Sequence, residues 1–301
     1  MIDFQNVSFS YGEESSGGGI RNVNLTINTG EFVLLTGESG CGKTTITRLV
    51  NGLVPHYYEG NLEGDVLLDG KSVSDTPLYD LAAMVGSVFQ NPKSQFFNVD
   101  TDSELAFACE NLGYPQEDIL KRIDRTVSDY HIEDLMGRSV FALSGGEKQK
   151  IACASSSVLL PGIMVLDEPS SNLDMAAIDD LRQVLSLWKK QGKTILIAEH
   201  RLYYLHDLAD RVLYVKDGEI EREYTPAEFD SLSDGTRKEM GLRPFSLSKL
   251  KPANQYQAHT AKQMEFQNFC FAYKKREPES LHIPSAELPV AVSYTHLRAH
   301  E

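Results

Sequence analysis

The chain has 301 residues, of which 41% are hydrophobic and 24% charged, as expected for a soluble globular protein with one large domain or two ordinary ones. Its formal net charge of −14 argues against non-specific binding to nucleic acid. No stretch approaches the ~20 apolar residues of a membrane span, and we expect no signal peptide. Four cysteines without a Cys-x-x-Cys pair argue against a metal knuckle or a disulfide framework and favour a reducing cytoplasm.

The first part of the chain predicts strands. Apolar and polar residues alternate over residues 2–10 and 22–28, with one irregularity in the first stretch. A buried strand is expected at residues 32–35, followed by a helix that starts at Thr45 and runs to Asn51. Two further strands are expected at residues 62–68 and 84–89.

The stretch between the third strand and its helix, Gly37-Glu-Ser-Gly-Cys-Gly-Lys-Thr44, is a complete phosphate-binding loop. Its glycines allow turns that a Cβ would forbid, so that backbone N–H groups can cradle a polyphosphate. Lys43 can reach the β- and γ-phosphates, and the hydroxyl of Thr44 can bind Mg²⁺. The candidate nucleotide-binding residues here are Gly37, Gly40, Gly42, Lys43, Thr44 and Thr45.

The second part of the chain alternates helices and strands. Residues 100–130 follow a helical pattern that Gly113 and Pro115 interrupt. The elements expected after it are a helix at 144–160, a strand at 162–166, a helix at 175–190, a strand at 194–198 and a strand pair at 211–215 and 219–223.

The start of the chain recurs near its end. Residues 264–273, Met-Glu-Phe-Gln-Asn-Phe-Cys-Phe-Ala-Tyr, repeat residues 2–11, Ile-Asp-Phe-Gln-Asn-Val-Ser-Phe-Ser-Tyr, with five identities in ten. Chance similarity of two strands is the alternative, but an internal repeat changes the expected architecture. The boundaries that we expect are a first domain at 1–230, a linker at 231–262, the truncated start of a second domain at 263–289 and a non-native tail at 290–301. Trimming at residue 230 is then expected to leave stability unchanged.

Two further motifs carry chemistry. Residues 163–168 form an apolar strand that ends in two carboxylates, of which Asp167 would hold Mg²⁺ through water and Glu168 would orient the attacking water. Ser144-Gly145-Gly146 opens a helix and can present N–H groups to another phosphate. One nucleotide cannot occupy both ends of a domain. We therefore expect ATP to lie between this domain and a second one.

These motifs resemble the ATP-binding cassette (ABC) transporter ATPases over residues 1–224. The resemblance implies an α/β fold of the P-loop NTPase class, with a mostly parallel core sheet, an antiparallel β subdomain and a helical subdomain that carries the signature at residues 144–149. It implies ATP and Mg²⁺ as ligands. It also implies a second ABC domain and membrane-embedded transporter subunits as partners, at the cytoplasmic face of the membrane. The net charge of −14 leads us to expect no nucleic-acid partner.

The resemblance also assigns roles to residues outside the phosphate loop. Tyr11 would stack on adenine, and Gln90 would sense Mg²⁺ and the γ-phosphate and link to the membrane partner. Asp174 would lie in the loop that crosses the dimer interface, and His200 would contact the γ-phosphate. The candidate catalytic residues are Lys43, Glu168 and His200, and the candidate metal ligands are Thr44, Gln90 and Asp167.

Three stretches, residues 89–97, 110–113 and 198–202, resemble energy-coupling-factor (ECF) transporter ATPases in particular. That group imports vitamins or cobalt and nickel ions, and two cassettes are sometimes fused in one chain. The alternative is a soluble ABC ATPase acting in DNA repair or translation, but the short stretch between Gln90 and Ser144 leaves no room for a long arm. A purely structural scaffold would need a missing catalytic carboxylate, and Glu168 is present. This sequence does not identify the transported substrate, because in this family we expect another subunit to bind it.

Overall fold

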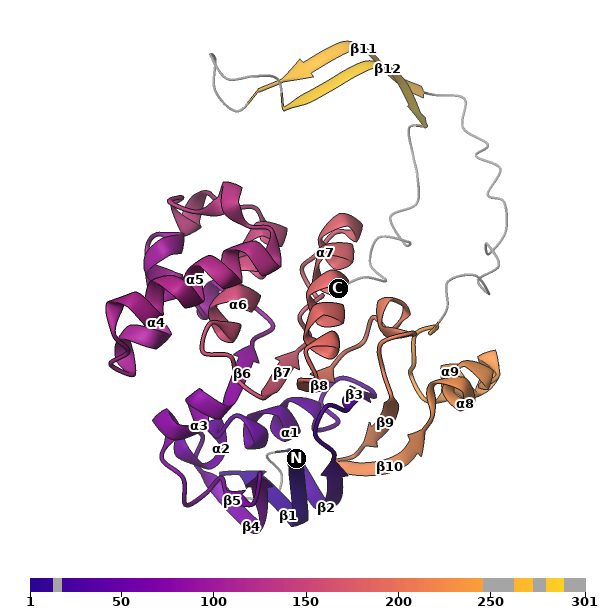
Figure 1. Ribbon diagram of the computed structural model, residues 1–301. Coiled ribbons are helices and arrows are strands. Elements are labelled where there is room, and N and C mark those ends of the chain that lie inside the picture. Colours follow the sequence, from indigo (N-terminus) through magenta and orange to yellow (C-terminus); the bar gives the residue numbers. More distant parts are fainter. Residues whose placement is uncertain (13–17, 246–262, 273–279, 290–301) are drawn as a thin grey trace. The chain divides into compact units, whose positions relative to one another are not determined.

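The computed structural model describes residues 1–12, 18–245, 263–272 and 280–289 (Figure 1). The chain divides into two compact units, Met1–Lys249 and Leu250–Glu301, and each is described here by itself. The tail expected at 290–301 and the linker beyond residue 245 lie outside the described residues.

The centre of the first unit is a six-stranded sheet whose strands are parallel except at one edge. Its order is β10 (Glu219–Tyr224), β9 (Arg211–Lys216), β3 (Phe32–Thr36), β8 (Thr194–Ala198), β7 (Ile163–Asp167) and β6 (Val85–Val88). Only β10 runs antiparallel to its neighbour. Every residue of β3 and β8 is buried, as expected for parallel strands that are covered on both faces.

The two faces of this sheet pack into two separate hydrophobic cores. Along β3, Phe32 and Leu34 face one core, and Val33 and Leu35 face the other. The first core contains the helices of the second part of the chain, including the fully buried Trp188. The second core lies toward the N-terminal strands and the phosphate-loop helix.

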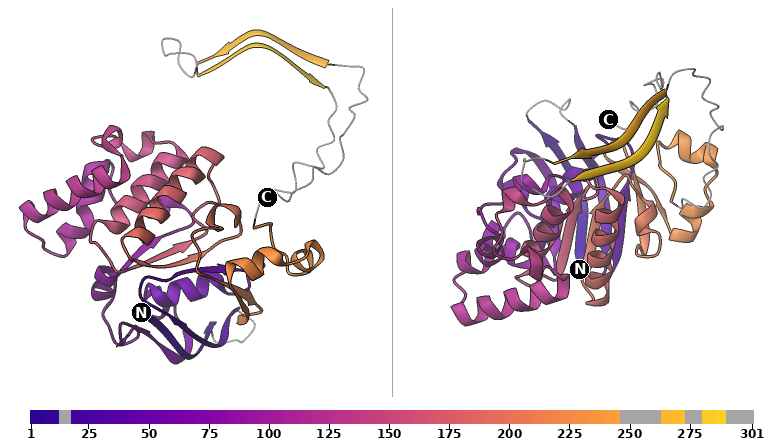
Figure 2. Two further views of the ribbon diagram at one scale, coloured as in Figure 1. Left: turned by 45° about the vertical axis from the view of Figure 1, so that its right-hand side comes forward. Right: turned by 90° about the horizontal axis from the view of Figure 1, so that it is seen from above.

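Four N-terminal strands form an antiparallel sheet. Its order is β2 (Gly19–Ile27), β1 (Ile2–Tyr11), β4 (Gly60–Leu68) and β5 (Lys71–Ser72). The irregularity expected in β1 is a register shift at Asn6, whose φ of 51° is left-handed. Helix α1 (Lys43–Val50) contacts strands of both sheets (Figure 2). Helix α2 (Leu53–His56) follows α1, and helix α3 (Leu78–Met84) follows β5; both contribute a residue to the second core.

A helical subdomain lies between β6 and β7. It contains η1 (Pro92–Ser94), α4 (Thr101–Asn111), α5 (Gln116–Tyr130), η2 (Glu133–Leu135), η3 (Val140–Ala142) and α6 (Gly145–Ser157). The helical pattern over 100–130 is two helices, because the left-handed Gly113 and Pro115 end one and begin the next. Helix α7 (Met175–Lys190) follows β7, and η4 (Tyr203–Leu205) follows β8. The expected α/β fold, with its antiparallel and helical subdomains, is confirmed.

The first unit does not end at residue 230, where we expected a linker to begin. Residues 226–245, here called the C-terminal extension, contain α8 (Pro226–Ser231) and α9 (Asp234–Glu239). Phe229 and Phe245 are both 0% exposed and pack edge to face, 5.2 Å apart, in the first core. The polar sequence around these two rings does not predict their burial, because burial depends on contacts with distant parts of the chain.

The extension also reaches the phosphate loop. A Cβ built on Gly241, whose φ is +64°, would lie 2.8 Å from Oε1 of Glu38. The Tyr214 hydroxyl donates to the carbonyl of Met240 at 3.2 Å and holds this turn in place. The extension therefore packs directly against the side chain of a loop residue.

The second unit contains a hairpin of β11 (Gln263–Phe271) and β12 (Leu281–Pro289), which pair antiparallel as β1 and β2 do. Asn268, with φ of 46°, occupies the place in the repeat that Asn6 has in β1. The sequence repeat is thus accompanied by a repeat of local structure. No helix within the described ranges is long and apolar enough to cross a membrane.

Candidate functional site

The phosphate-binding loop joins β3 to α1, and two of its glycines are required by close contacts. At Gly37, with φ of +151°, a Cβ would lie 2.1 Å from the carbonyl oxygen of Val215. At Gly42, with φ of +109°, it would lie 3.0 Å from the carbonyl oxygen of Gly19. A side chain at either position would displace the backbone that surrounds the loop.

Lys43, the first residue of α1, turns back into the loop. Its Nζ donates to the carbonyl of Gly37 at 3.1 Å and to that of Glu38 at 2.8 Å. The residue is 4% exposed. The positive charge is therefore fixed inside the loop, where the N-terminus of the helix also favours an anion.

Thr44 and Asp167 lie together at the start of α1 and the end of β7. The Thr44 hydroxyl donates to Oδ1 of Asp167 at 3.1 Å. Burial raises the pKa of Asp167 above its usual value, against the opposing effects of Thr44, Arg48 and Lys43. A hydroxyl beside a carboxylate fits Mg²⁺, which takes oxygen ligands and often only one or two from the protein. In the described part of the chain, no group of three or more His, Cys, Asp or Glu residues is suited to a metal.

Glu168 meets two of the other predicted residues. Its Oε2 accepts from Nε2 of Gln90 at 3.1 Å, and its Oε1 lies 3.1 Å from Nε2 of His200. The His200 imidazole lowers the pKa of Glu168, although partial burial opposes this. The three residues follow the neighbouring strands β6, β7 and β8, whose carboxyl ends share one edge of the sheet. Glu168 itself has a left-handed φ of 43°.

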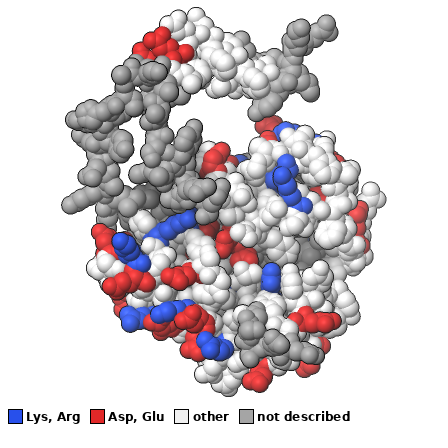
Figure 3. Space-filling view, turned by 180° about the vertical axis from the view of Figure 1, so that it is seen from behind, with Lys and Arg blue, Asp and Glu red and all other residues white. Residues whose placement is uncertain are grey.

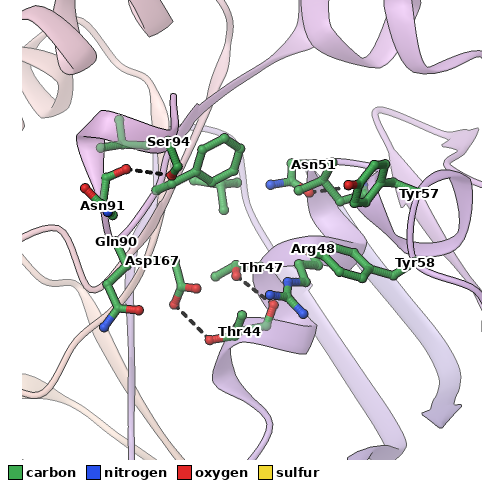
Figure 4. Close-up of a pocket in the computed structure, with 14 residues that line it drawn as sticks. Thr44, Thr47, Arg48, Asn51, Tyr57, Tyr58, Gln90, Asn91, Ser94 and Asp167 are labelled. Atoms are coloured by element: carbon green, nitrogen blue, oxygen red, sulfur yellow. Dashed lines mark hydrogen bonds between the residues drawn. The ribbon is translucent and has the colours of Figure 1, made fainter. Parts of the chain in front are cut away.

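A groove of about 640 Å³ opens beside this cluster (Figure 4). Gln90, Asn91 and Ser94 lie on one side of it, and Asn51 and Tyr57 on the other. Thr44 and Asp167 line it between these two sides. The groove therefore connects the Thr44–Asp167 pair with the molecular surface.

Tyr11 lies close to the start of α1. Its hydroxyl is 3.3 Å from Oγ1 of the buried Thr45 and accepts from Nη1 of Arg48 at 3.1 Å. The guanidinium of Arg48 also lies 4.1 Å from the ring centre of Tyr58. Arg48 and Tyr58 were missed in the sequence. For Arg48 the available signal was its place one helical turn after Thr44.

The signature residues lie in a different pocket, of about 590 Å³. Ser144 caps α6 in a capping box with Glu147. Asp174 lines the same pocket, but its carboxylate caps α7 by accepting from the amide of Ala177 at 2.9 Å. The glycines at 145 and 146 line the pocket as well.

The predicted residues therefore fall into two groups. The first surrounds the phosphate loop and contains Tyr11, Gly37, Gly40, Gly42, Lys43, Thr44, Thr45, Gln90, Asp167, Glu168 and His200. The second surrounds the start of α6 and contains Ser144, Gly145, Gly146 and Asp174. Among the residues that the structure describes, the groove beside Thr44 and the pocket around Ser144 share no lining residue.

The sequence profile of the ABC transporter family matches residues 20–171, which contain the loop, Gln90 and the two carboxylates. The chain belongs to the ABC transporter family. An ABC transporter ATP-binding protein of Treponema denticola is 47% identical over 251 residues, 83% of this chain and 51% of that protein. One from Pyrococcus abyssi is 40% identical over 229 residues, 76% of this chain and 81% of that protein. The cassette thus spans about half the length of the Treponema relative.

Two solved structures have the same fold. CbiO1 from Clostridium perfringens, described as part of the ABC transporter complex CbiONQ, superimposes with a TM-score of 0.68 and 27% identity over 79% of this chain and 93% of that one. The cassette MJ0796, in a dimer bound to ADP and phosphate, gives a TM-score of 0.65 and 26% identity over 75% of this chain and 99% of that one. The P-loop NTPase fold of the ABC type is confirmed.

Proposed function

We propose that this cassette binds ATP and Mg²⁺, hydrolyses ATP in a dimer of cassettes and thereby powers a membrane importer at the cytoplasmic face of the membrane. The observation that carries the proposal is the contact of Glu168 with both Gln90 and His200, beside the Thr44–Asp167 pair. Such a cluster places a carboxylate, an amide and an imidazole at one edge of a phosphate-binding sheet.

In the proposed reaction, Lys43 and the loop amides bind the β- and γ-phosphates of ATP. Thr44, Asp167 and Gln90 would hold Mg²⁺, whose charge would offset that of the phosphates. The lowered pKa of Glu168 keeps its carboxylate ionised near neutral pH, so that it can accept a hydrogen bond from the attacking water and orient it. His200, whose Nε2 already contacts Glu168, would hold the γ-phosphate.

A second cassette completes the site in this proposal. The signature pocket around Ser144 lies apart from the phosphate loop, so each would serve a different nucleotide. ATP would then lie between the loop of one cassette and the signature of the other, and the dimer of MJ0796 with ADP and phosphate is a precedent for two such cassettes. The hairpin β11–β12 would be the start of a second, fused cassette.

The membrane partner would bind in the groove beside Gln90. Tyr57, Tyr79 and Phe97 are 71%, 64% and 76% exposed, and large exposed aromatic side chains are typical of protein interfaces. An occupant of the groove would contact Gln90, which bonds to Glu168. We propose an importer of the ECF type, with a vitamin or a cobalt or nickel ion as cargo, and CbiO1 supports this class.

Substitution of Lys43 tests the site directly. Lys43→Ala removes the side-chain cation that the loop encloses, and we expect ATP binding or hydrolysis to be lost. Phosphate release from the purified protein measures this. Hydrolysis near the wild-type rate would contradict the assignment.

Glu168→Gln separates binding from chemistry. The amide keeps the shape of the side chain but cannot act as a base, so we expect ATP to stay bound and to trap a closed dimer. Size-exclusion chromatography with ATP measures the dimer, and phosphate release measures the rate. An unchanged rate would show that Glu168 does not orient the water.

A soluble ABC ATPase that acts in DNA repair or translation is the second candidate function. On the face shown in Figure 3, Lys and Arg side chains lie among Asp and Glu side chains, and the net charge of −14 disfavours a nucleic-acid partner. Purification of the tagged full-length protein from its host distinguishes the two. Recovery with membrane proteins supports the importer, and recovery with ribosomes or DNA supports the alternative.

A further inference from the structure

Glu199 is a buried acid between the loops that carry Glu168 and His200. It follows the last residue of β8 and is only 1% exposed. Burial of a carboxylate is costly unless hydrogen bonds replace those of water. The groups that form hydrogen bonds with Glu199 therefore indicate what this buried side chain does.

Each oxygen of Glu199 accepts two hydrogen bonds. Oε1 accepts from the amide of Ser170 at 3.2 Å and from the hydroxyl of Tyr204 at 2.9 Å. Oε2 accepts from the amides of His200 at 2.7 Å and Arg201 at 3.1 Å. One side chain thus joins the loop after β7 to the loop after β8.

Both loops have to be held for Glu168 and His200 to meet. Glu168, two residues before Ser170, has a left-handed φ of 43°, and such strain persists only where neighbouring contacts maintain it. The His200 amide that Glu199 accepts belongs to the residue whose imidazole lies 3.1 Å from Glu168. A displacement of about 1 Å at a reacting group can lower a rate by ~100-fold.

We propose that Glu199 is a positioning residue for ATP hydrolysis. It fixes the two loops so that His200 faces Glu168, and it does not itself touch the nucleotide. The inference rests on the proposed ATPase function and adds to it a residue that neither the sequence motifs nor the family match assigns.

Glu104 provides a matched control, because it is also buried, with 4% exposure. Its Oε2 accepts from the amides of Phe97 at 3.0 Å and Asn98 at 2.8 Å. These bonds stay within a few positions of α4 and join no loop to the cluster of Glu168. Glu104→Gln therefore tests the cost of a lost buried carboxylate without removing a contact of the Glu168 cluster.

The main experiment compares Glu199→Gln and Glu104→Gln in the full chain. A glutamine has only one acceptor oxygen, so two of the four donors to residue 199 lose their partner. We expect kcat to fall ~10-fold or more in Glu199→Gln, with KM for ATP within about threefold of wild type, and no fall of kcat in Glu104→Gln. Wild-type kcat in Glu199→Gln, or an equal fall in both variants, would overturn the inference.

A double variant tests whether Glu199 acts through His200. Since the two would belong to one unit, Glu199→Gln should slow the His200→Ala protein by less than twofold, whereas independent effects would multiply. Multiplying effects would overturn the inference.

If Glu199→Gln does not fold, Tyr204→Phe keeps the carboxylate and removes one donor. A fall in kcat at constant KM then supports the inference, and an unchanged kcat overturns it.

The two proposals can fail separately. An active wild-type protein with an unaffected Glu199→Gln variant would overturn the positioning role alone. A wild-type protein without ATPase activity would overturn the proposed function and this inference with it.

Discussion

The two hairpins, β1–β2 and β11–β12, have similar sequences and the same local geometry, yet they differ in burial. Phe9 is 2% exposed, whereas Phe271, its counterpart in the repeat, is 45% exposed. Val7 is fully buried, and its counterpart Phe269 is 43% exposed. The residues of a hairpin therefore set its pairing and its left-handed asparagine, but the rest of the domain provides its burial.

Two elements, β4 and α1, bury strand β1 in the first unit. Strand β4 pairs with its second edge, and α1 packs against the sheet that β1 forms. Among the described residues, β11 pairs only with β12. A two-stranded hairpin alone is marginally stable, and burial of one aromatic ring is worth about 2–3 kcal/mol. The comparison supports the proposal that β11–β12 begins a second cassette.

The largest expected effect comes from moving the C-terminal end of the first unit. A chain that ends at residue 231 loses Phe245 and leaves Phe229 without that neighbour, so we expect its free energy of unfolding to fall by about 3–5 kcal/mol. A chain that ends at residue 249 keeps the whole C-terminal extension and should lose less than ~1 kcal/mol. Urea unfolding measures both. Equal stability of the two chains would show that the first domain ends near residue 230, as the sequence predicts.

A matched pair of substitutions tests the hairpins themselves. Phe9→Ala removes a ring from the second core and should cost about 3–5 kcal/mol of unfolding free energy. Phe271→Ala removes a ring that is 45% exposed and should cost less than ~1 kcal/mol. The measurement is the same urea titration in the full chain. A comparable loss at both positions would show that the second hairpin is covered in solution.

The smallest effect is expected at the left-handed asparagines. Asn6→Ala places a Cβ at φ of 51° without a side chain suited to it, which should cost about 1 kcal/mol, and Asn6→Gly should cost less. Asn268→Ala makes the same change in the second unit and should leave the unfolding of the first unit unchanged. A shift of the main transition by Asn268→Ala would show that the two units unfold together.

The sequence predicted the features that depend on neighbouring residues. The phosphate loop, the alternation of β1 and the carboxylates after β7 all follow from short patterns, and the structure brings Gln90, Glu168 and His200 into contact. Parallel strands explain this success. Residues that directly follow neighbouring parallel strands lie close together, because the carboxyl ends of these strands form one edge of the sheet.

The features that the sequence did not predict depend on contacts between distant segments. Phe245 is buried because Phe229 and the first core surround it, and nothing in its polar neighbourhood indicates this. Glu199 lies in the stretch 198–202 that resembles the ECF ATPases. Only its hydrogen bond with the amide of Ser170, 29 positions away, shows which two loops it connects. Polar residues with distant partners are the most difficult ones to interpret from a single sequence.

The left-handed backbone of Glu168 has a consequence for how such cassettes change over time. This conformation costs a residue with a Cβ about 1 kcal/mol, and asparagine or glycine would adopt it more easily. In the proposed reaction, the role of Glu168 in orienting water therefore outweighs the local preference of the backbone for another residue. In a duplicated cassette released from the need to hydrolyse ATP, this position would be among the first at which drift toward asparagine or glycine relieved strain.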